Sequence, residues 1–315
     1  MKVQSLLTLA VTAALITSGS AAITMDWVTV GNAGNVADTA DGDPYTSGNQ
    51  YYGAVANAYQ IGKYEVTNAQ YGAFLNAKGS TNSNGIYNSS MSSYGITQSG
   101  SSSSFIYSVT SGFEQKPVVY VSWYDAARFA NWMMNGQANG DMETGAYTLS
   151  GTTGIILKNS GASVWLPSED EWYKAAYYNA TPTPSYSLCP NGQNTISTAG
   201  ANYEIAVGST TVVGTYSGDP SSYGTNDQGG NVWEWNDAVI SGSSRGRRGG
   251  SFSNSELSLL SSTRSNGVPT AENGSIGFRV ASSSIAAVPE PSGLLTTAAL
   301  VASSLLLRRR SKNSL

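Results

Sequence analysis

The chain has 315 residues, of which 11% are charged and 40% hydrophobic, so it can form one large domain with additional segments at its ends. Its formal net charge of -4 gives no basic surface of the kind that nucleic-acid binding needs, which disfavours DNA or RNA as a partner. It contains no histidine and one cysteine, Cys189, which excludes histidine-based hydrolysis, Cys-His nucleophiles, histidine-held zinc or iron, and an internal disulfide.

The first 22 residues have the order of a secretory signal peptide. Lys2 is followed by an apolar run over residues 6–16 and then by small residues that end in Ala21 and Ala22. We predict cleavage after Ala22, which leaves a folded domain over residues 23–284. A buried first helix is the alternative, but the polar residues downstream of the apolar run suit peptidase recognition better than packing.

Short strands and a capped helix follow the cleavage site. Residues 28–30 and the alternating segment 58–66 predict two strands. Thr67, with Gln70 three residues later, forms a capping box that predicts a helix. The apolar face of this helix consists of Tyr71, Phe74 and Leu75.

A polar stretch separates this helix from the next buried segment. Residues 79–104 are dominated by Ser, Gly and Asn and predict a surface insertion, in which Tyr87 and Tyr94 anchor loops. Residues 117–121 (Pro-Val-Val-Tyr-Val) predict a buried strand.

Two further helices are predicted by the same capping pattern. Ser122 with Asp125 begins a helix over residues 126–134, and Ser168 with Glu171 begins a third. Glu169, Asp170 and Glu171 crowd its first turn, where the helix dipole favours acids, so we assign them a structural rather than a catalytic role. The inward faces consist of Phe129, Ala130, Trp132 and Met133 in the second helix, and of Trp172, Ala175 and Ala176 in the third.

The rest of the domain is rich in turn residues. Residues 181–226 are rich in Pro, Gly, Ser and Thr, with strands predicted at 203–207 and 211–216. Three motifs then follow: Gly-Gly-Asn-Val-Trp-Glu-Trp at 229–235, Arg-Gly-Gly-Ser-Phe at 248–252 and Gly-Phe-Arg-Val at 277–280. Glycines set the backbone of such turns and aromatic residues fill the space between them. The sequence therefore predicts an irregular α+β domain with few short helices.

Four segments in this order resemble the formylglycine-generating enzyme (sulfatase-modifying factor) family. They are residues 62–68, 117–126 and 166–172, together with the motifs of residues 229–280. The resemblance implies a variant of the C-type lectin fold, with little regular secondary structure and often with bound calcium. One departure is Trp165, which stands where the family usually has an arginine before Leu-Pro.

The resemblance also implies where the chemistry of the family would lie. Its enzymes oxidise a sulfatase cysteine to formylglycine, using copper held by two cysteines that correspond here to Asn254 and Leu259. Neither side chain binds copper(I), which prefers thiolates, so copper is not expected and no catalytic residue is predicted. Trp235 and Ser251 match residues of the family's active-site pocket, whereas Cys189 lies far upstream and is interpreted as an incidental thiol.

The family resemblance also implies a calcium site, and the ligands of one such site have matching residues in this sequence. One family site corresponds to the carbonyls of Gly230 and Val232 and the carboxylate of Glu234, which are oxygen ligands of the kind that calcium takes. The alternative is that Glu234 pairs with an arginine such as Arg248 or Arg279. For a second family site only Asn202 matches, and no partnering aspartate is evident.

The C-terminal segment, residues 285–315, has the order of a sorting signal. Pro-Glu-Pro at 289–291 precedes an apolar segment at 294–307 and three arginines at 308–310. This order resembles the PEP-CTERM signal of Gram-negative-type bacteria, which enters the membrane transiently and is removed by an exosortase. A simple tail anchor is the alternative, but it needs no Pro-Glu-Pro.

The sequence thus favours an exported, non-catalytic module, a pseudoenzyme of the bacterial cell envelope, cell surface or extracellular matrix. Its Tyr-, Ser-, Gly- and Asn-rich composition is typical of adaptable recognition surfaces, which predicts a polysaccharide or protein ligand. A formylglycine-generating oxidase and a purely structural, calcium-held matrix protein are the alternatives.

Overall fold

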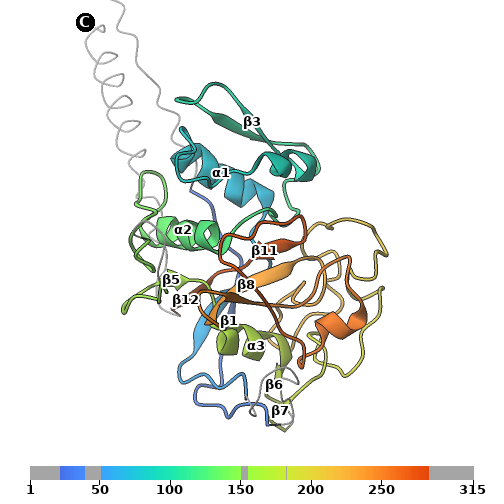
Figure 1. Ribbon diagram of the computed structural model, residues 1–315. Coiled ribbons are helices and arrows are strands. Elements are labelled where there is room, and N and C mark those ends of the chain that lie inside the picture. The colour runs from blue at the N-terminus through green and yellow to red at the C-terminus, as the bar shows by residue number, and fades with distance from the viewer. Residues whose placement is uncertain (1–21, 40–50, 150–154, 182, 284–315) are drawn as a thin grey trace, which may run out of the picture.

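The computed structural model describes residues 22–39, 51–149, 155–181 and 183–283 (Figure 1). Nearly all of the predicted signal peptide and the whole predicted sorting signal lie outside these ranges. Within them, no helix is long and apolar enough to cross a membrane.

Three α-helices begin at the predicted capping boxes. They are α1 (Asn68–Lys78), α2 (Trp123–Met134) and α3 (Glu169–Tyr177). In each, the N-cap hydroxyl accepts from the N3 backbone N–H while the N3 side chain accepts from the N-cap backbone N–H. The predicted apolar faces are buried, which confirms these local predictions.

The strands form two four-stranded sheets and two small hairpins. The first sheet has the order β1 (Trp27–Val30), β2 (Tyr59–Gly62), β12 (Ala281–Ser283) and β5 (Val164–Trp165), all antiparallel. The second has the order β10 (Ser265–Gly267), β9 (Arg245–Arg248), β8 (Trp233–Val239) and β11 (Ile276–Phe278), with β8 and β11 parallel. One hairpin consists of β3 (Ile96–Ser99) and β4 (Ile106–Val109), and the other of β6 (Tyr178–Asn179) and β7 (Ser185–Tyr186). Two 3₁₀ helices, η1 (Ser89–Tyr94) and η2 (Glu256–Leu259), lie in the connecting segments.

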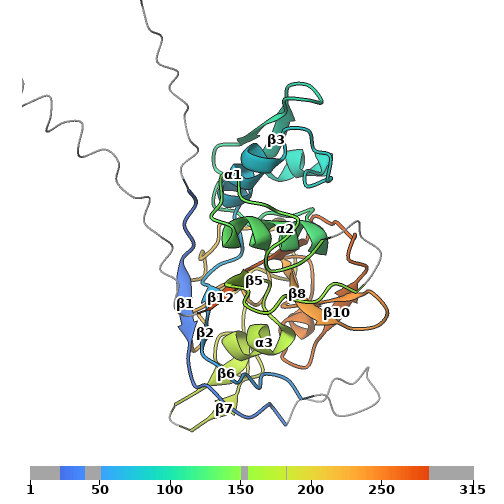
Figure 2. The same ribbon diagram turned by 90° about the vertical axis from the view of Figure 1, so that its left-hand side faces the viewer.

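The elements are arranged in layers. In Figures 1 and 2, α2 and α3 lie on opposite sides of the two sheets, and α1 with the β3–β4 hairpin lies beyond α2. Aromatic rings fill the space between α1, α2 and β11: Phe74, Phe129 and Phe278 are fully buried, and Phe129 meets the other two edge-on.

Three predicted strands are wrong. Residues 118–121 carry buried valines but no strand ladder, because Tyr120 has a left-handed backbone with φ 59°. Residues 203–207 form turns for the same reason, since Glu204 and Ile205 have φ values of 53° and 59°. Residues 211–216 also form turns, and the strand predicted at 58–66 is limited to β2.

The predicted insertion at 79–104 is more than a surface loop. It contains η1 and β3, and Ile86, Met91 and Ile96 from this segment are buried in the main core. Tyr87 donates a hydrogen bond to the Ile96 carbonyl, which agrees with its interpretation as a loop anchor.

Candidate functional site

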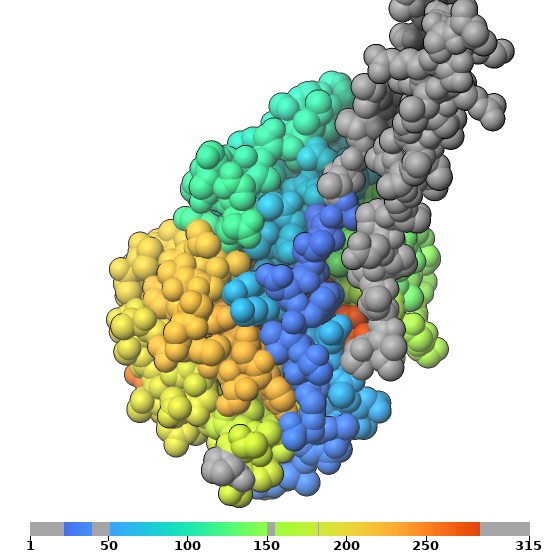
Figure 3. Space-filling view, turned by 180° about the vertical axis from the view of Figure 1, so that it is seen from behind, coloured from blue at the N-terminus to red at the C-terminus, as the bar shows by residue number. Residues whose placement is uncertain are grey.

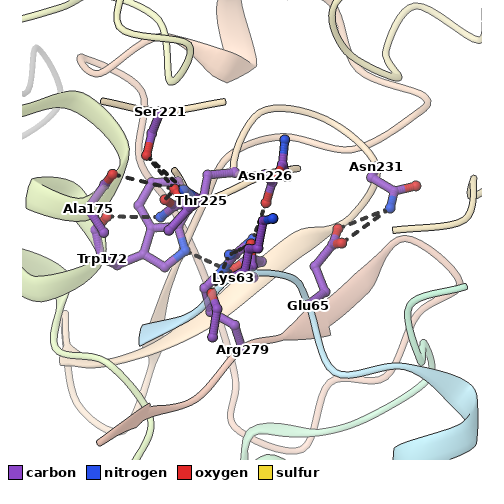
Figure 4. A network of polar contacts seen from close by, with 12 residues as sticks. Lys63, Glu65, Trp172, Ala175, Ser221, Thr225, Asn226, Asn231 and Arg279 are labelled. Carbon is purple, nitrogen blue, oxygen red and sulfur yellow. Dashed lines mark hydrogen bonds and ion pairs between the residues drawn. The ribbon is translucent and has the colours of Figure 1, made fainter. Parts of the chain in front are cut away.

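The centre of the candidate site is a fully buried ion pair between Glu234 and Arg279. The Arg279 guanidinium meets both carboxylate oxygens, with Nε 2.6 Å from Oε2 and Nη2 2.7 Å from Oε1. The indole of Trp172 donates a third hydrogen bond to Oε2 at 2.8 Å. Figure 4 shows Trp172 and Arg279 in this network. Of the two arginines considered from the sequence, Arg279 is therefore the one that pairs with Glu234.

The fold positions this pair by strand register and backbone carbonyls. Gly277 of β11 lies beside Glu234 of β8, two residues before Arg279. The guanidinium also donates to the carbonyl oxygens of Gly62, at 2.9 Å, and Asn226, at 2.9 Å. Arg279 thus joins both sheets and a loop, which explains why it can be buried with its charge.

Two further carboxyl groups, those of Glu65 and Asp227, interact electrostatically with the guanidinium of Arg279. Glu65 is buried, and the side-chain amide of Asn231 donates to its two oxygens at 3.1 and 3.4 Å. Burial, followed by repulsion from Asp227 and Glu234, raises the pKa of the Glu65 carboxyl well above its usual range. Burial likewise raises the pKa of Asp227 to about 6. The region therefore favours either protonated carboxyl groups or an additional cation.

We expect stability to fall as the pH rises from about 5 to about 8. Burial raises the pKa of Asp125 to about 7 and that of Asp237 to about 7, as it does for Asp227 at about 6. These folded pKa values exceed the unfolded value of about 3.9, so the folded state binds the three protons more tightly than the unfolded state does. The resulting contribution to the free energy of unfolding is complete below pH about 4 and is lost as the pH rises through 6 to 7. The melting temperature should drop by about 5 °C or more.

Thermal unfolding followed by circular dichroism at pH 5, 6.5 and 8 measures this drop. Asp125→Asn is the matched control, because an amide oxygen can still accept the hydrogen bonds from the Ser122 N–H and hydroxyl, at 2.9 and 2.6 Å. This variant should show a smaller drop. A melting temperature that rises with pH would contradict the expectation.

The residues predicted for calcium come together in part. A Cβ at Gly230, whose φ is 81°, would clash with the carbonyl oxygen of Asn202, so these two backbones are in direct contact. The Asn231 N–H donates to that carbonyl at 2.8 Å. Within the described ranges, Oδ1 of Asn202 is buried without a hydrogen-bond partner, and no three acidic or cysteine side chains form a metal-binding group.

Sequence reasoning did not select Glu65, Asp227 or Asn231 for this site. Glu65 lies in one of the motifs that carried the family resemblance, and Asp227 and Asn231 flank the two glycines at 229–230. The signal that the sequence offered was an acidic or amide residue near a glycine turn. Such residues are common in loops because they favour turn conformations, so this signal did not single out a site.

The two positions at which the family resemblance places copper cysteines, Asn254 and Leu259, have structural roles in this chain. The Asn254 side-chain oxygen accepts hydrogen bonds from the Ser251 N–H and hydroxyl, at 3.1 and 2.6 Å. Leu259 is fully buried against Ala201 and Tyr203. These groups offer a hard amide oxygen and a hydrocarbon, so they do not fit copper(I).

The two predicted pocket residues do not face solvent. Trp235 and Ser251 are both 0% exposed, and the Trp235 indole donates to the Val121 carbonyl at 3.0 Å within the main core. Trp233, at the start of the same strand, is only partly buried.

Cys189 lies beside the segment of residues 259–261, although it is about 70 positions earlier in the sequence. The Ser261 N–H donates to the Leu188 carbonyl at 2.9 Å, which holds the two segments together. The thiol is fully buried, and burial raises its pKa to about 11. It is therefore a protonated thiol at neutral pH.

We expect Cys189 to resist alkylation in the folded protein. A buried thiol with so high a pKa exposes almost no thiolate, so iodoacetamide should react at least about a hundredfold more slowly than with the protein unfolded in guanidinium. Mass spectrometry of timed samples at pH 7.5 measures both rates. Equal rates would show that the thiol is accessible.

A second buried ion network lies at the N-terminus of α3. Glu169 accepts from Nε of Arg248 at 2.7 Å and from Nη2 of Arg264 at 2.7 Å. Tyr52 lies against both guanidinium groups, with centroid distances of 4.5 and 5.5 Å. Glu169 thus has the structural role that the sequence predicted.

Two surface hollows flank this network. One, of about 440 Å³, is lined by Tyr51, Arg264 and Asp237 among others. The other, of about 490 Å³, is lined by Trp165 and Lys158 among others, and both include Asp170. Aromatic rings beside planar charged groups provide apolar contact together with hydrogen bonding, a combination suited to small polar ligands.

Comparisons with known proteins agree with this architecture. The family model described as the sulfatase-modifying factor enzyme 1-like domain matches residues 19–284. The solved structure of CarF is 22% identical, with a TM-score of 0.52, over 82% of this chain and 98% of that one. Variable protein 1 of Treponema denticola is also 22% identical, with a TM-score of 0.50, over 82% of this chain and 94% of that one. No functionally curated protein matches the sequence.

At this identity the structural similarities establish the fold alone. They confirm the irregular α+β fold that the sequence predicted, with few short helices and several small sheets.

Proposed function

The chain belongs to the sulfatase-modifying factor enzyme 1-like family, and from this premise we propose that it is an exported, non-catalytic member. It serves as a binding or structural module of the bacterial cell envelope, cell surface or extracellular matrix. The observation that carries this proposal is the pair Asn254 and Leu259, whose side chains hold a turn and fill a core where the family resemblance places copper-binding sulfur.

The loss of catalysis follows from the donor atoms of the chain. A copper(I) centre of this family needs two thiolates, and the one cysteine of the sequence, Cys189, has a buried, protonated thiol. One thiol cannot replace two thiolates. The retained Ser251 and Trp235 are both buried and support the fold, so they offer no substitute mechanism.

Export is proposed from the two ends of the sequence. A signal peptidase removes residues 1–22, and an exosortase removes the C-terminal segment after its transient insertion into the membrane. Mass spectrometry of the protein recovered from the surface and medium of an exosortase-bearing bacterium tests both steps. We expect a chain that lacks both ends, whereas an uncleaved cytoplasmic chain would contradict export.

A polysaccharide or protein ligand is proposed for the surface around α3. Tyr51 is 45% exposed at the hollow that also contains Arg264, so an aromatic ring and charged groups are presented together. Glycan arrays and pull-down experiments with the purified protein test this role, with Tyr51→Ala as the variant that should weaken binding. If neither experiment detects a ligand, the structural role is favoured.

Calcium is proposed near Gly230, where it would offset the excess negative charge of Glu65 and Asp227. The proposed ligands are the carbonyls of Gly230 and Val232, with Glu234 as the acidic group. Because Arg279 already meets both oxygens of Glu234, only part of the ligand set fits calcium in this arrangement.

A chelator experiment tests calcium binding. EDTA should lower the melting temperature by several degrees at pH 7.5 and less at pH 5, where protonation of Glu65 and Asp227 removes the excess charge. Asp227→Asn should reduce the effect of EDTA at pH 7.5. No shift in melting temperature at pH 7.5 would remove the proposed site.

A further inference from the structure

Residues 23–26 form a segment, called the strap, whose backbone is hydrogen-bonded to the rest of the domain. The Ile23 N–H donates to Oε1 of Gln137 at 2.7 Å, and Nε2 of Gln137 donates to the Ile23 carbonyl at 2.9 Å. The Thr24 carbonyl accepts from Nε2 of Gln70 at 2.9 Å. Figure 3 shows this part of the chain, in blue, running along the back of the molecule.

The strap continues directly into the first sheet. The Asp26 carbonyl accepts from the Lys63 N–H at 2.7 Å, and β1 begins at the next residue. Ile23 and Met25 pack against the main core. Contacts that hold the strap to the domain therefore include the residue that follows the predicted cleavage site.

Gln137 is held in an unusual conformation that aims its side chain at Ile23. Its backbone is left-handed, with φ 63°, and its N–H donates to the Trp132 carbonyl at 2.9 Å. Its side chain is buried, at 5% exposure. A non-glycine residue in this conformation is uncommon, and here it places the oxygen and the nitrogen of the side-chain amide against the N–H and the carbonyl group of one residue, Ile23.

The same place is the C-terminal end of α2. Helix carbonyl groups there favour a positive charge, yet the last turn of α2 contains no basic side chain. Charged groups on the neighbouring segments include Asp26 on the strap side, Asp141, whose carbonyl oxygen accepts from the side-chain amide of Asn135 at 2.8 Å, and Lys78 at the end of α1, whose ammonium reaches the Asn139 carbonyl at 3.4 Å. The helix end beside Gln137, whose own last turn has no basic residue, therefore favours an additional positive charge.

We propose that cleavage after Ala22 supplies this cation, so that the new α-ammonium group of Ile23 docks on Gln137 and stabilises the folded domain. Water hydrolyses the bond between Ala22 and Ile23: the C–N bond breaks, the hydroxyl adds to the Ala22 carbonyl carbon, and the nitrogen takes up the remaining proton of the water. The new carboxylic acid then releases its proton and the amine takes one up, which leaves a carboxylate on Ala22 and an ammonium group on Ile23. An export-associated peptidase provides the catalysis. This inference rests on the export proposed above, and the uncleaved chain has only a neutral amide at this position.

The experiment compares two purified chains, one beginning at Ile23 and one beginning at Ala21. Both are released from a fusion partner by a protease that leaves no additional residue. We expect the chain with the free Ile23 amine to melt about 2–4 °C higher, as for a cation at a helix C-terminus in a domain of this size. Gln137→Met should shrink the difference because it removes both hydrogen bonds.

Gln137→Glu provides a test that depends on charge rather than on packing. The carboxylate pairs with the ammonium group, so the difference between the two chains should grow beyond that of the unchanged protein. Equal melting temperatures for the two unchanged chains, or a difference that Gln137→Glu leaves unaltered, would overturn the inference.

N-terminal sequencing of the exported protein separates this inference from the proposed export. A mature chain that begins at Ile23 supports both. Export with a different first residue contradicts the docking proposal alone. A chain that keeps its first 22 residues contradicts export, while the comparison of the two purified chains still decides whether a free Ile23 amine docks.

Discussion

Arg279→Met should destabilise the protein by about 3–5 kcal/mol, a large fraction of the total stability of a typical domain. Among the residues that the structure describes, the substitution leaves the fully buried Glu234 carboxylate with the Trp172 indole as its one remaining side-chain donor. It also removes the positive charge that lowers the pKa of Glu65 and Asp227, so their burial becomes more costly. Urea unfolding followed by tryptophan fluorescence measures the loss, and much of the variant is expected to be insoluble.

Two further variants separate the ion pair from a general loss of packing. Arg279→Met combined with Glu234→Gln removes the isolated charge, so it should recover part of the lost stability. Lys63→Met removes a partly buried cation that lies 5.2 Å from the Tyr64 ring and should cost less than about 1 kcal/mol. A cost for Arg279→Met as small as that for Lys63→Met would show that the buried pair does not hold the fold together.

The double variant Asn254→Cys with Leu259→Cys should gain copper(I) binding, roughly a thousandfold tighter than the unchanged protein. The two substitutions supply the soft ligands at the positions to which the family resemblance assigns the metal. Leu259→Cys removes buried hydrocarbon and should cost about 2 kcal/mol of stability. Competition with a chromogenic copper(I) chelator under anaerobic conditions measures the affinity.

Asn254→Ser with Leu259→Ala is the matched control, because it removes the same side chains without adding sulfur. It should bind copper(I) no better than the unchanged protein. If the cysteine variant folds but gains no affinity, these two positions do not correspond to the metal site of the family.

Local features of the fold could be predicted from the sequence, and pairings between distant segments could not. Each helix start depends on a hydroxyl and a partner three residues later, as with Thr67 and Gln70, and all three starts are confirmed. The strands predicted near Tyr120 and Ile205 fail because their left-handed backbones are fixed by contacts with distant loops. For example, the Ile205 N–H donates to the Phe252 carbonyl at 2.7 Å.

The candidate site shows the same division. The sequence offered an arginine partner for Glu234 as the alternative to calcium, with Arg248 and Arg279 as candidates. Arg248 lies opposite Glu234 on β9, but its guanidinium bonds to Glu169, a contact between distant segments that only the fold shows, and Arg279 pairs with Glu234. The excess of buried carboxyl groups was not predictable, because Glu65 and Asp227 are 162 residues apart and meet only through the fold. The position of Cys189 beside residues 259–261 was missed for the same reason.

The measurement that tests the proposed loss of catalysis most directly is an oxidation assay with the unchanged protein. The purified chain is incubated with copper(I), oxygen and a peptide that carries a sulfatase-type cysteine, and the peptide is followed by mass spectrometry. A catalytically active family member serves as the positive control. We predict no formylglycine above the level of the peptide with copper alone, whereas enzyme-dependent conversion of the cysteine would contradict the account.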